Sequence, residues 1–408
     1  MSSSGAMLPD TSLDRPLIAH HTNATMTRRW QQRYQGQRPC YVCVLGFTQT
    51  ALIPNISAAG NTPQDRLLTA LADAEFIYEG PSTAPYYPLP SLQAGVSPAL
   101  LTRAVTAGQC LPVYLFDAGL PHRPSVPHID LGGTIARCVS SGQALSPATV
   151  AQLFAAGRHW GETLGRRFAR SYLVVGECVV AGTTTAQAVL SALEFNVAGL
   201  MGSSHPTCNH TQKAALIETG LAAWDGGGKG NRVWDAIAAV GDPMQPFVLG
   251  MAMAASSHCG VLLAGGSQMI AVYTMLRCLD TQYPWNPDNI VIGTTQWIVN
   301  DATSQFLALA RTVPTPPIMS SQFSFKQSRY SQLTIFEQGY VKEGVGAGGC
   351  LIAGHLYQNW QQHKTLQAME SLLESSLKIS DPPSGEPALN PVISKPARSS
   401  HLSSELDG

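Results

Sequence analysis

The chain has 408 residues, of which only 12% are charged, and its formal net charge is −1. Nucleic-acid-binding domains usually carry a strong basic excess, so this charge balance argues against a nucleic-acid partner. Hydrophobic residues make up 44% of the chain, which also contains 37 glycines and 28 prolines. This composition predicts a compact, loop-rich α/β protein with a large core, and the low charge also fits an oligomer.

The sequence contains no segment typical of secretion or membrane insertion. Residues 1–10 lack the basic and apolar parts of a signal peptide, and apolar runs such as 260–264 are far too short to span a bilayer. We therefore expect a soluble, cytoplasmic protein with no membrane partner. The nine cysteines are scattered and odd in number, which indicates reduced thiols rather than a disulfide framework.

Both ends of the chain are polar. Residues 1–38 are rich in Ser and Thr, and we interpret them as disordered or as part of a small helical subdomain formed by the chain ends. Residues 381–408 are rich in Ser and Pro. This composition predicts a disordered tail, because it buries too little apolar surface to offset the entropy lost on ordering. We interpret residues 39–380 as one α/β domain.

Within this domain, short apolar runs alternate with helical patterns. Strands are predicted at residues 41–47, 74–78, 111–116, 172–175, 261–263 and 290–292. Helices are predicted at residues 62–74, 146–168, 184–193, 214–221 and 250–257. This alternation indicates a three-layer, Rossmann-like α/β fold with a mostly parallel sheet, in which ligands bind beyond the carboxyl ends of the strands.

The segment 172–185 places a glycine, the carboxylate of Glu177 and a run of threonines after a predicted strand. Backbone N–H groups and hydroxyls at the start of a helix, here at Gly182, Thr183 and Thr184, favour an anion such as phosphate. Simple N-capping by threonine explains the same pattern equally well.

The segment 202–213 contains His205, Cys208 and His210, whose side chains could bind a metal ion. Three ligands without an evident fourth are a weak signal, because structural zinc takes four, so we expect no metal. Lys213 opens the next helical pattern and could contact a phosphate as a point charge. An ordinary surface lysine is the alternative interpretation.

Two further turns contain small residues. Gly241 and Asp242 precede a helical pattern, and Gly265 and Gly266 follow the predicted strand 261–263. The second turn is a candidate ligand-facing loop at a strand end. Close packing of helices on the sheet is the alternative reason for small residues here.

The most informative stretch, residues 338–349, sets one carboxylate, Glu343, in a glycine-rich turn before an apolar run. Glycine lets the backbone approach a ligand closely. A carboxylate held away from bulk water can have its pKa raised toward neutrality and can act as a general base. A solvated glutamate in a loop is the alternative.

From about residue 42 to residue 354, the order of these motifs resembles the nicotinate-nucleotide:dimethylbenzimidazole phosphoribosyltransferase family, which makes the lower-ligand nucleotide of cobalamin. The family's Gly-Glu-x-x-x-Gly-Asn-Thr-Thr segment is similar to residues 176–185, and its Glu-Gly-Thr-Gly-Ala segment to residues 343–347. Four other family features resemble segments that begin at Lys213, Val240, Leu263 and Ile56. These features are a lysine-led helix, the Val-Gly-Gly and Leu-Asp-Gly-Phe motifs, and a loop near the acceptor base.

The resemblance implies a role for each matching residue. Glu343 corresponds to the family's general base, and Ser57 lies in the segment that resembles the loop near the acceptor base. The implied nucleotide- and phosphate-binding residues are Glu177, Gly182, Thr183, Thr184, Lys213, Gly241, Asp242, Gly265, Gly266, Gly344 and Gly346. The resemblance also implies a homodimer. Neither a metal nor another cofactor is expected, because the leaving pyridinium of such a reaction already carries positive charge.

The implied function is transfer of a 5-phosphoribosyl group from nicotinate mononucleotide to an aromatic nitrogen base, benzimidazole- or purine-like, for the lower ligand of a cobamide. Some positions depart from the family pattern. One residue is inserted between Glu177 and Gly182, Asp242 stands where the family has a second glycine, and Ala264 stands where it has aspartate. These departures indicate a divergent branch whose relatives are uncharacterised. They leave open a non-catalytic nucleotide-binding or regulatory protein of the cobamide pathway.

Overall fold

The computed structural model describes residues 16–90, 92, 94–224, 226 and 232–380. Its middle layer is an eight-stranded sheet in the order β1-β8-β7-β6-β5-β2-β3-β4. β1 runs antiparallel to β8, and all other neighbouring strands are parallel. The strands are β1 (Ile18–Thr22), β2 (Cys40–Gly46), β3 (Val113–Gly119), β4 (Ile129–Asp130), β5 (Tyr172–Val179), β6 (Gly260–Ala264), β7 (Ile290–Thr295) and β8 (Ile318–Ser321).

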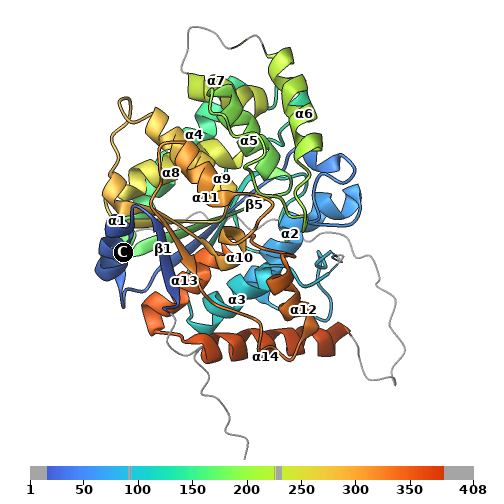
Figure 1. Ribbon diagram of the computed structural model, residues 1–408, viewed down its shortest axis with the longest axis vertical. Coiled ribbons are helices and arrows are strands. Elements are labelled where there is room, and N and C mark those ends of the chain that lie inside the picture. The colour runs from blue at the N-terminus through green and yellow to red at the C-terminus, as the bar shows by residue number, and fades with distance from the viewer. Residues whose placement is uncertain (1–15, 91, 93, 225, 227–231, 381–408) are drawn as a thin grey trace, which may run out of the picture.

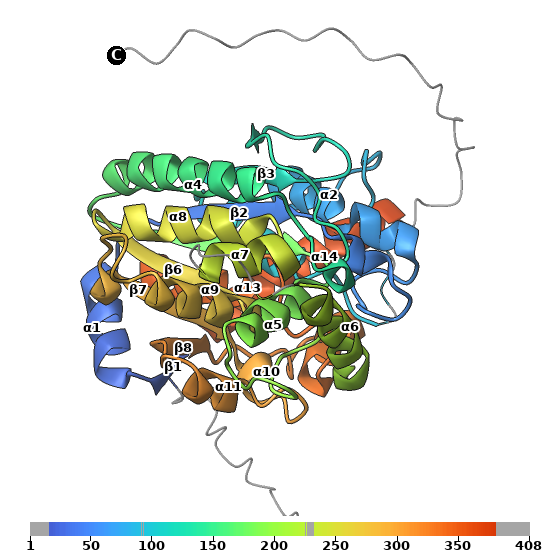
Figure 2. The ribbon, with the colours of Figure 1, turned by 90° about the horizontal axis from the view of Figure 1, so that it is seen from above.

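Helices cover both faces of this sheet, so the predicted α/β class with a mostly parallel sheet is confirmed (Figures 1 and 2). One face is covered mainly by α4 (Pro147–Arg167), α5 (Gly182–Ala192), α6 (His210–Ala223), α7 (Arg232–Val240), α8 (Met244–Ser256), α9 (Ser267–Cys278) and α11 (Phe306–Thr312). The other carries α2 (Pro63–Glu79), α3 (Ala99–Gly108), α13 (Ala347–Gln358) and α14 (Gln362–Ser380). The remaining α-helices are α1 (Ala24–Tyr34), α10 (Gln296–Val299) and α12 (Ser331–Thr334).

The central strand β5 divides its side chains between two hydrophobic cores. Leu173 and Val175 join the core under α8 and α9, whereas Tyr172 and Val174 join the core under α3 and α13. This alternation follows from the two-residue period of a strand. Both faces are buried, which is why the strand reads as a continuous apolar run in the sequence.

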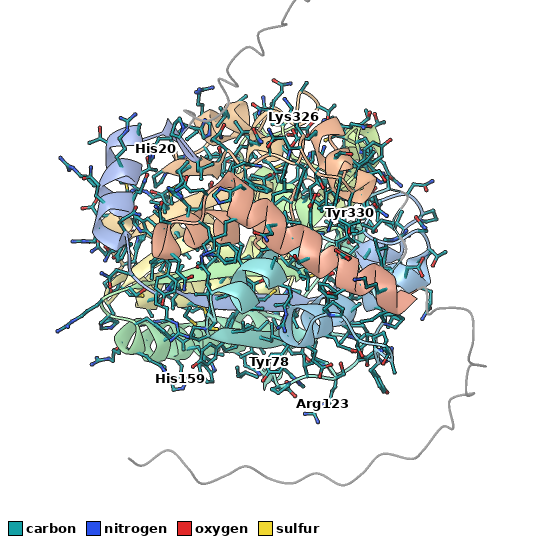
Figure 3. All side chains as sticks on the ribbon, turned by 90° about the horizontal axis from the view of Figure 1, so that it is seen from below. His20, Tyr78, Arg123, His159, Lys326 and Tyr330 are labelled. Atoms are coloured by element: carbon teal, nitrogen blue, oxygen red, sulfur yellow. The ribbon has the colours of Figure 1, made fainter. Side chains whose placement is uncertain are left out.

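The chain ends are arranged differently from the helical subdomain that we expected. β1 extends the sheet at its edge, with Ile18 opposite Ser321 of β8. α1 then packs there through Trp30, whose indole Nε1 donates to the carbonyl of Asn289 at 2.9 Å. α14 instead packs on α3, and Figure 3 shows it crossing one face of the molecule while α1 lies at the edge. The two chain ends therefore do not form one subdomain, because β1 and α1 lie at the edge of the sheet and α14 packs on α3.

The strand predicted at residues 74–78 is wrong, because these residues continue α2, which is 17 residues long. The predicted start of this helix is correct. Thr62 accepts a hydrogen bond from the backbone N–H of Asp65, whose side chain accepts one from the N–H of Thr62. A short apolar run does not distinguish a buried strand from a buried helix.

The predicted tail at 381–408 lies outside the described residues. Within the described ranges, no helix combines the length and the hydropathy that crossing a membrane requires.

Candidate active site

A cavity of about 180 Å³ lies at the carboxyl ends of β5 and β6. Its walls come from the start of α5, the start of α9, two turns of α2 and the segment before α13. This is the position at which parallel α/β sheets bind ligands. The polar side chains in its lining are those of Ser57, Thr69, Asp73, Ser97, Glu177, Thr183, Ser203, Ser204, Ser267, Gln268, Tyr340, Lys342 and Glu343.

Glu343 reaches the cavity from the segment that leads into α13. Its Oε1 accepts hydrogen bonds from the backbone N–H groups of Gly348 at 3.0 Å and Gly344 at 3.2 Å. Its Oε2 accepts one from the hydroxyl of Thr294 at 3.3 Å. Burial raises the pKa of Glu343 to about 7, although these hydrogen bonds act in the opposite direction. A carboxylate with this pKa can take up a proton near neutral pH.

The backbone around Glu343 requires glycine. A Cβ on Gly348 would lie 2.2 Å from the carbonyl carbon of Thr294, and one on Gly349 would lie 2.3 Å from the Cβ of Ala264. Both distances are too short for real carbon contacts. They also explain Ala264, because a larger side chain there would collide with α13.

Two β-branched residues beside Glu343 have left-handed backbone conformations. Val341 has a φ of 53° and Val345 a φ of 43°. Such conformations cost about 1–3 kcal/mol each and collect at functional sites. The strain therefore marks the same segment that the glycine pattern singled out.

Glu177 lies at the end of β5 and is buried. Its Oε1 accepts from the Nε2 of Gln268 at 2.7 Å, and its Oε2 accepts from the backbone N–H of Val179 at 2.9 Å. Burial, helped by the negative charges of Asp242 and Glu343, raises the pKa of Glu177 to about 8. The site therefore holds two carboxyl groups that change charge near neutral pH.

Lys213 is buried at the start of α6, with 1% of its surface exposed. Its Nζ donates to the hydroxyl of Thr183 at 2.9 Å and to the carbonyl of Gly202. Thr183 and Gly202 both line the cavity. Among the described residues no carboxylate pairs with Lys213, and burial lowers its pKa to about 8. An ammonium group without a counterion thus stands beside the cavity.

A second buried lysine is fully paired. The Nζ of Lys342 lies 2.6 Å from the Oδ2 of Asp301. Burial alone would raise the pKa of Asp301, but hydrogen bonds from Lys342 and Thr303 outweigh it, and the pKa is lowered. This pair fastens the segment before α13 to the loop that follows α10.

The structure brings together part of the predicted site. The predicted residues that line the cavity are Ser57, Glu177, Gly182, Thr183, Gly266, Glu343 and Gly344, and Lys213 reaches it through its hydrogen bonds. The predicted residues outside the lining are Thr184, Gly241, Asp242, Gly265 and Gly346.

Asp242 and Thr184 are buried and do not line the cavity. Asp242 accepts from the hydroxyl of Thr185 at 2.6 Å and from the backbone N–H of Met244 at 3.1 Å, so it organises the start of α8. The hydroxyl of Thr184 is buried and has no hydrogen-bond partner among the described residues.

The candidate metal ligands bind other groups. The Nε2 of His205 lies 3.0 Å from the carbonyl oxygen of Asn55. The Nε2 of His210 lies 2.8 Å from the carbonyl oxygen of Thr303. Across the described ranges, no group of three or more His, Cys, Asp or Glu side chains is arranged to hold a metal ion.

Sequence reasoning missed several polar residues of the cavity, above all Gln268 and Asp73. Gln268 follows the Gly-Gly-Ser turn after β6 and could have been found from its place at a strand end. Asp73 stands in the apolar run Leu71–Ala74 of a charge-poor chain, which is a signal for a buried carboxylate. It lies within the helix predicted at residues 62–74, which the structure extends to Glu79.

Known proteins resemble this chain in sequence and in fold. The Phosphoribosyltransferase family model matches residues 105–283. The UPF0284 protein of Acaryochloris marina (strain MBIC 11017) is 52% identical over 373 residues, covering 90% of this chain and 100% of that protein. The UPF0284 protein of Trichodesmium erythraeum (strain IMS101) is 50% identical over 363 residues, covering 88% and 99%.

Among solved structures, nicotinate-nucleotide-dimethylbenzimidazole phosphoribosyltransferase from Thermus thermophilus has a TM-score of 0.54 and 14% identity, covering 86% of this chain and 92% of that one. At this identity the likeness concerns the fold. The resemblance noted in the sequence is confirmed, and the chain belongs to the UPF0284 protein family, a divergent branch with the phosphoribosyltransferase fold.

Proposed function

We propose that this protein transfers a 5-phosphoribosyl group from nicotinate mononucleotide to an aromatic nitrogen base, for the lower ligand of a cobamide. One observation supports this most. A carboxyl group with a pKa of about 7, that of Glu343, lines the same cavity that the unpaired ammonium of Lys213 adjoins. A nucleotide needs a cation for its phosphate, and an N–H nucleophile needs a base.

Lys213 would hold the phosphate of the donor nucleotide. Within the described part of the chain, its ammonium hydrogen-bonds only to neutral oxygen atoms, those of Thr183 and Gly202. A phosphate would add the missing negative charge, and charge-assisted hydrogen bonds are stronger than neutral ones. Thr183 belongs to the first turn of α5, and the backbone N–H groups at this helix start would favour the same anion.

Glu343 would take the proton from the ring nitrogen of the acceptor base. That nitrogen then forms a bond to the anomeric carbon of the ribose, through a transition state with oxocarbenium character. The bond between this carbon and the pyridinium nitrogen breaks, and its electron pair leaves with neutral-ring nicotinate. The proton remains on Glu343, whose pKa of about 7 allows its later release to water.

The test is incubation of the full chain with nicotinate mononucleotide and a panel of benzimidazoles and purines, with detection of free nicotinate. Glu343→Gln should lower turnover by about 10²–10⁴-fold, the usual contribution of a general base. Glu337→Gln is the matched control. Glu337 also accepts a backbone N–H, from Phe325 at 2.7 Å, but lies outside the cavity lining, so its variant should keep wild-type turnover.

The competing interpretation is a non-catalytic nucleotide-binding protein of the cobamide pathway, suggested by the departures at Asp242 and Ala264. Binding of nicotinate mononucleotide without release of nicotinate, with every base supplied, would favour it. Equal turnover of the wild type and Glu343→Gln would move the base role to another carboxylate, and Glu177 is the nearest candidate.

A further inference from the structure

The cavity contains a buried anion for which the proposed mechanism has no use. Asp73, on α2, has 4% of its surface exposed and lines the cavity. Its Oδ1 accepts a hydrogen bond from the hydroxyl of Ser97 at 2.6 Å. Its Oδ2 is 3.5 Å from the Sγ of Cys178. No Lys, Arg or His forms an ion pair with Asp73 within the described part of the chain.

Asp73 and Glu177 approach the cavity from opposite faces of the sheet. Cys178, next to Asp73, joins the core under α2 and α3. Its neighbour Glu177 contacts Gln268 of α9, which covers the other face. Consecutive residues of a strand point to opposite faces. Asp73 therefore belongs to a different wall from the group of Glu177 and Gln268.

The wall of Asp73 is joined to the loop that carries Ser57. Thr69, one helical turn before Asp73, donates its hydroxyl proton to the carbonyl of Ala59 at 2.8 Å. Ser57, in the same loop, contacts the hydroxyl of Ser204 at 3.0 Å. Asp73, Thr69 and Ser57 thus form one continuous wall, on the side where the acceptor base is expected.

This carboxylate has unused capacity for hydrogen bonds. Burial raises the pKa of Asp73 to about 6, so it is mostly ionised above neutral pH and can only accept. An ionised carboxylate offers about four acceptor positions. One hydroxyl and one distant, weakly donating thiol occupy few of them. A buried acceptor without donors is costly, so a ligand that brings a donor gains affinity.

We propose that Asp73 is the specificity-determining residue for the acceptor. It selects a heteroaromatic base that carries an amino, N–H or hydroxyl donor on the edge away from the reacting nitrogen. A base with only methyl groups on that edge would leave the carboxylate unsatisfied and would be disfavoured. This inference rests on the proposed function, because it assigns one substrate of the same cavity.

The test compares 5-aminobenzimidazole with 5-methylbenzimidazole, which are similar in size and differ in the donor. The full chain is supplied with nicotinate mononucleotide, and kcat/KM is measured for each base by release of nicotinate. We expect the amino compound to be preferred by about 10–100-fold, the factor typical of a hydrogen bond to a charged group. Asp73→Asn should reduce this ratio toward one, and Asp73→Leu should reverse it.

Glu75→Gln is the matched control. Glu75 lies two residues further along α2 and is also buried, but it accepts from the backbone N–H groups of Tyr86 at 2.7 Å and Tyr87 at 2.9 Å. It does not line the cavity. Its variant should keep the wild-type ratio, and circular dichroism of all variants establishes that they fold.

An equal ratio in the wild type and in Asp73→Asn, or a wild-type preference for the methyl compound, would overturn the inference. If no base releases nicotinate, the proposed function is wrong, but this result alone does not test the role of Asp73. Calorimetric binding of the same two bases then decides the role of Asp73. Tighter binding of the amino compound to the wild type, lost in Asp73→Asn, supports it, and equal affinities sink it.

Discussion

Two buried lysines stand beside one cavity and differ in what surrounds their ammonium groups. Lys342 lies 2.6 Å from the carboxylate of Asp301, and both side chains are almost closed off from solvent. Lys213 is just as buried, but its hydrogen bonds go to a hydroxyl and a backbone carbonyl. The first charge is neutralised within the fold, whereas no carboxylate among the described residues neutralises the second.

The buried carboxyl groups repeat this contrast. Asp301, which is paired with a cation, has a lowered pKa. Burial raises the pKa of Asp73, Glu177 and Glu343, which form no ion pair with the residues that the structure describes. Burial of a charge is costly unless it is paired. The comparison therefore distinguishes charges that are paired within the fold from buried charges that are not, and three measurements test it.

The largest effect is expected at the paired site. Asp301→Asn leaves Lys342 as an unpaired buried cation and should lower the free energy of unfolding by about 3–5 kcal/mol. Urea denaturation at neutral pH measures this. The control is Glu374→Gln, which breaks exposed contacts with Arg329 and Lys378 and should change stability little, because surface ion pairs contribute little. A loss below about 1 kcal/mol for Asp301→Asn would remove the structural role from the pair.

The unpaired lysine should respond in the opposite way. Lys213→Met removes a desolvated cation, so the ligand-free protein should keep or slightly gain stability. Binding of nicotinate mononucleotide should weaken by about 1.5–3 kcal/mol, the range for a hydrogen bond to a charged group. Calorimetry measures the affinity, with Lys364→Met, an exposed lysine of α14, as the control. Unchanged affinity for the nucleotide would exclude Lys213 from the site.

The smallest expected effect is the slope of stability with pH, to which one carboxyl group contributes at most about 1.4 kcal/mol per pH unit. The pKa of Glu177 is raised from 4.5 to about 8, and that of Glu343 from 4.5 to about 7. Between the ordinary and the raised pKa the folded protein binds more protons than the unfolded chain, so the free energy of unfolding should fall as pH rises. Thermal denaturation of the ligand-free protein at several values across this window measures the slope, and Glu177→Gln should flatten it. A slope that Glu177→Gln leaves unchanged would mean that Glu177 ionises normally.

Local sequence determined several of the elements and one candidate for the general base. Thr62, Pro63 and Asp65 predict the start of α2, because a capping box involves only neighbouring residues. Glu343 could be singled out because its glycines lie within a few residues of it. The Val-Leu-Leu run of β6 likewise predicts its own strand, since burial on both faces demands apolar residues throughout.

Which charges are paired depends on the tertiary structure. Lys342 and Asp301 are separated by 41 residues in the chain, and no local pattern distinguishes this lysine from Lys213. Asp242 was predicted to bind the nucleotide, and its side chain accepts a hydrogen bond at the start of α8. No role was predicted for Asp73, which lines the cavity. Composition and periodicity determine which segments are buried. The pairing of charges depends on which loops converge at one edge of the sheet, and these loops come from distant parts of the chain.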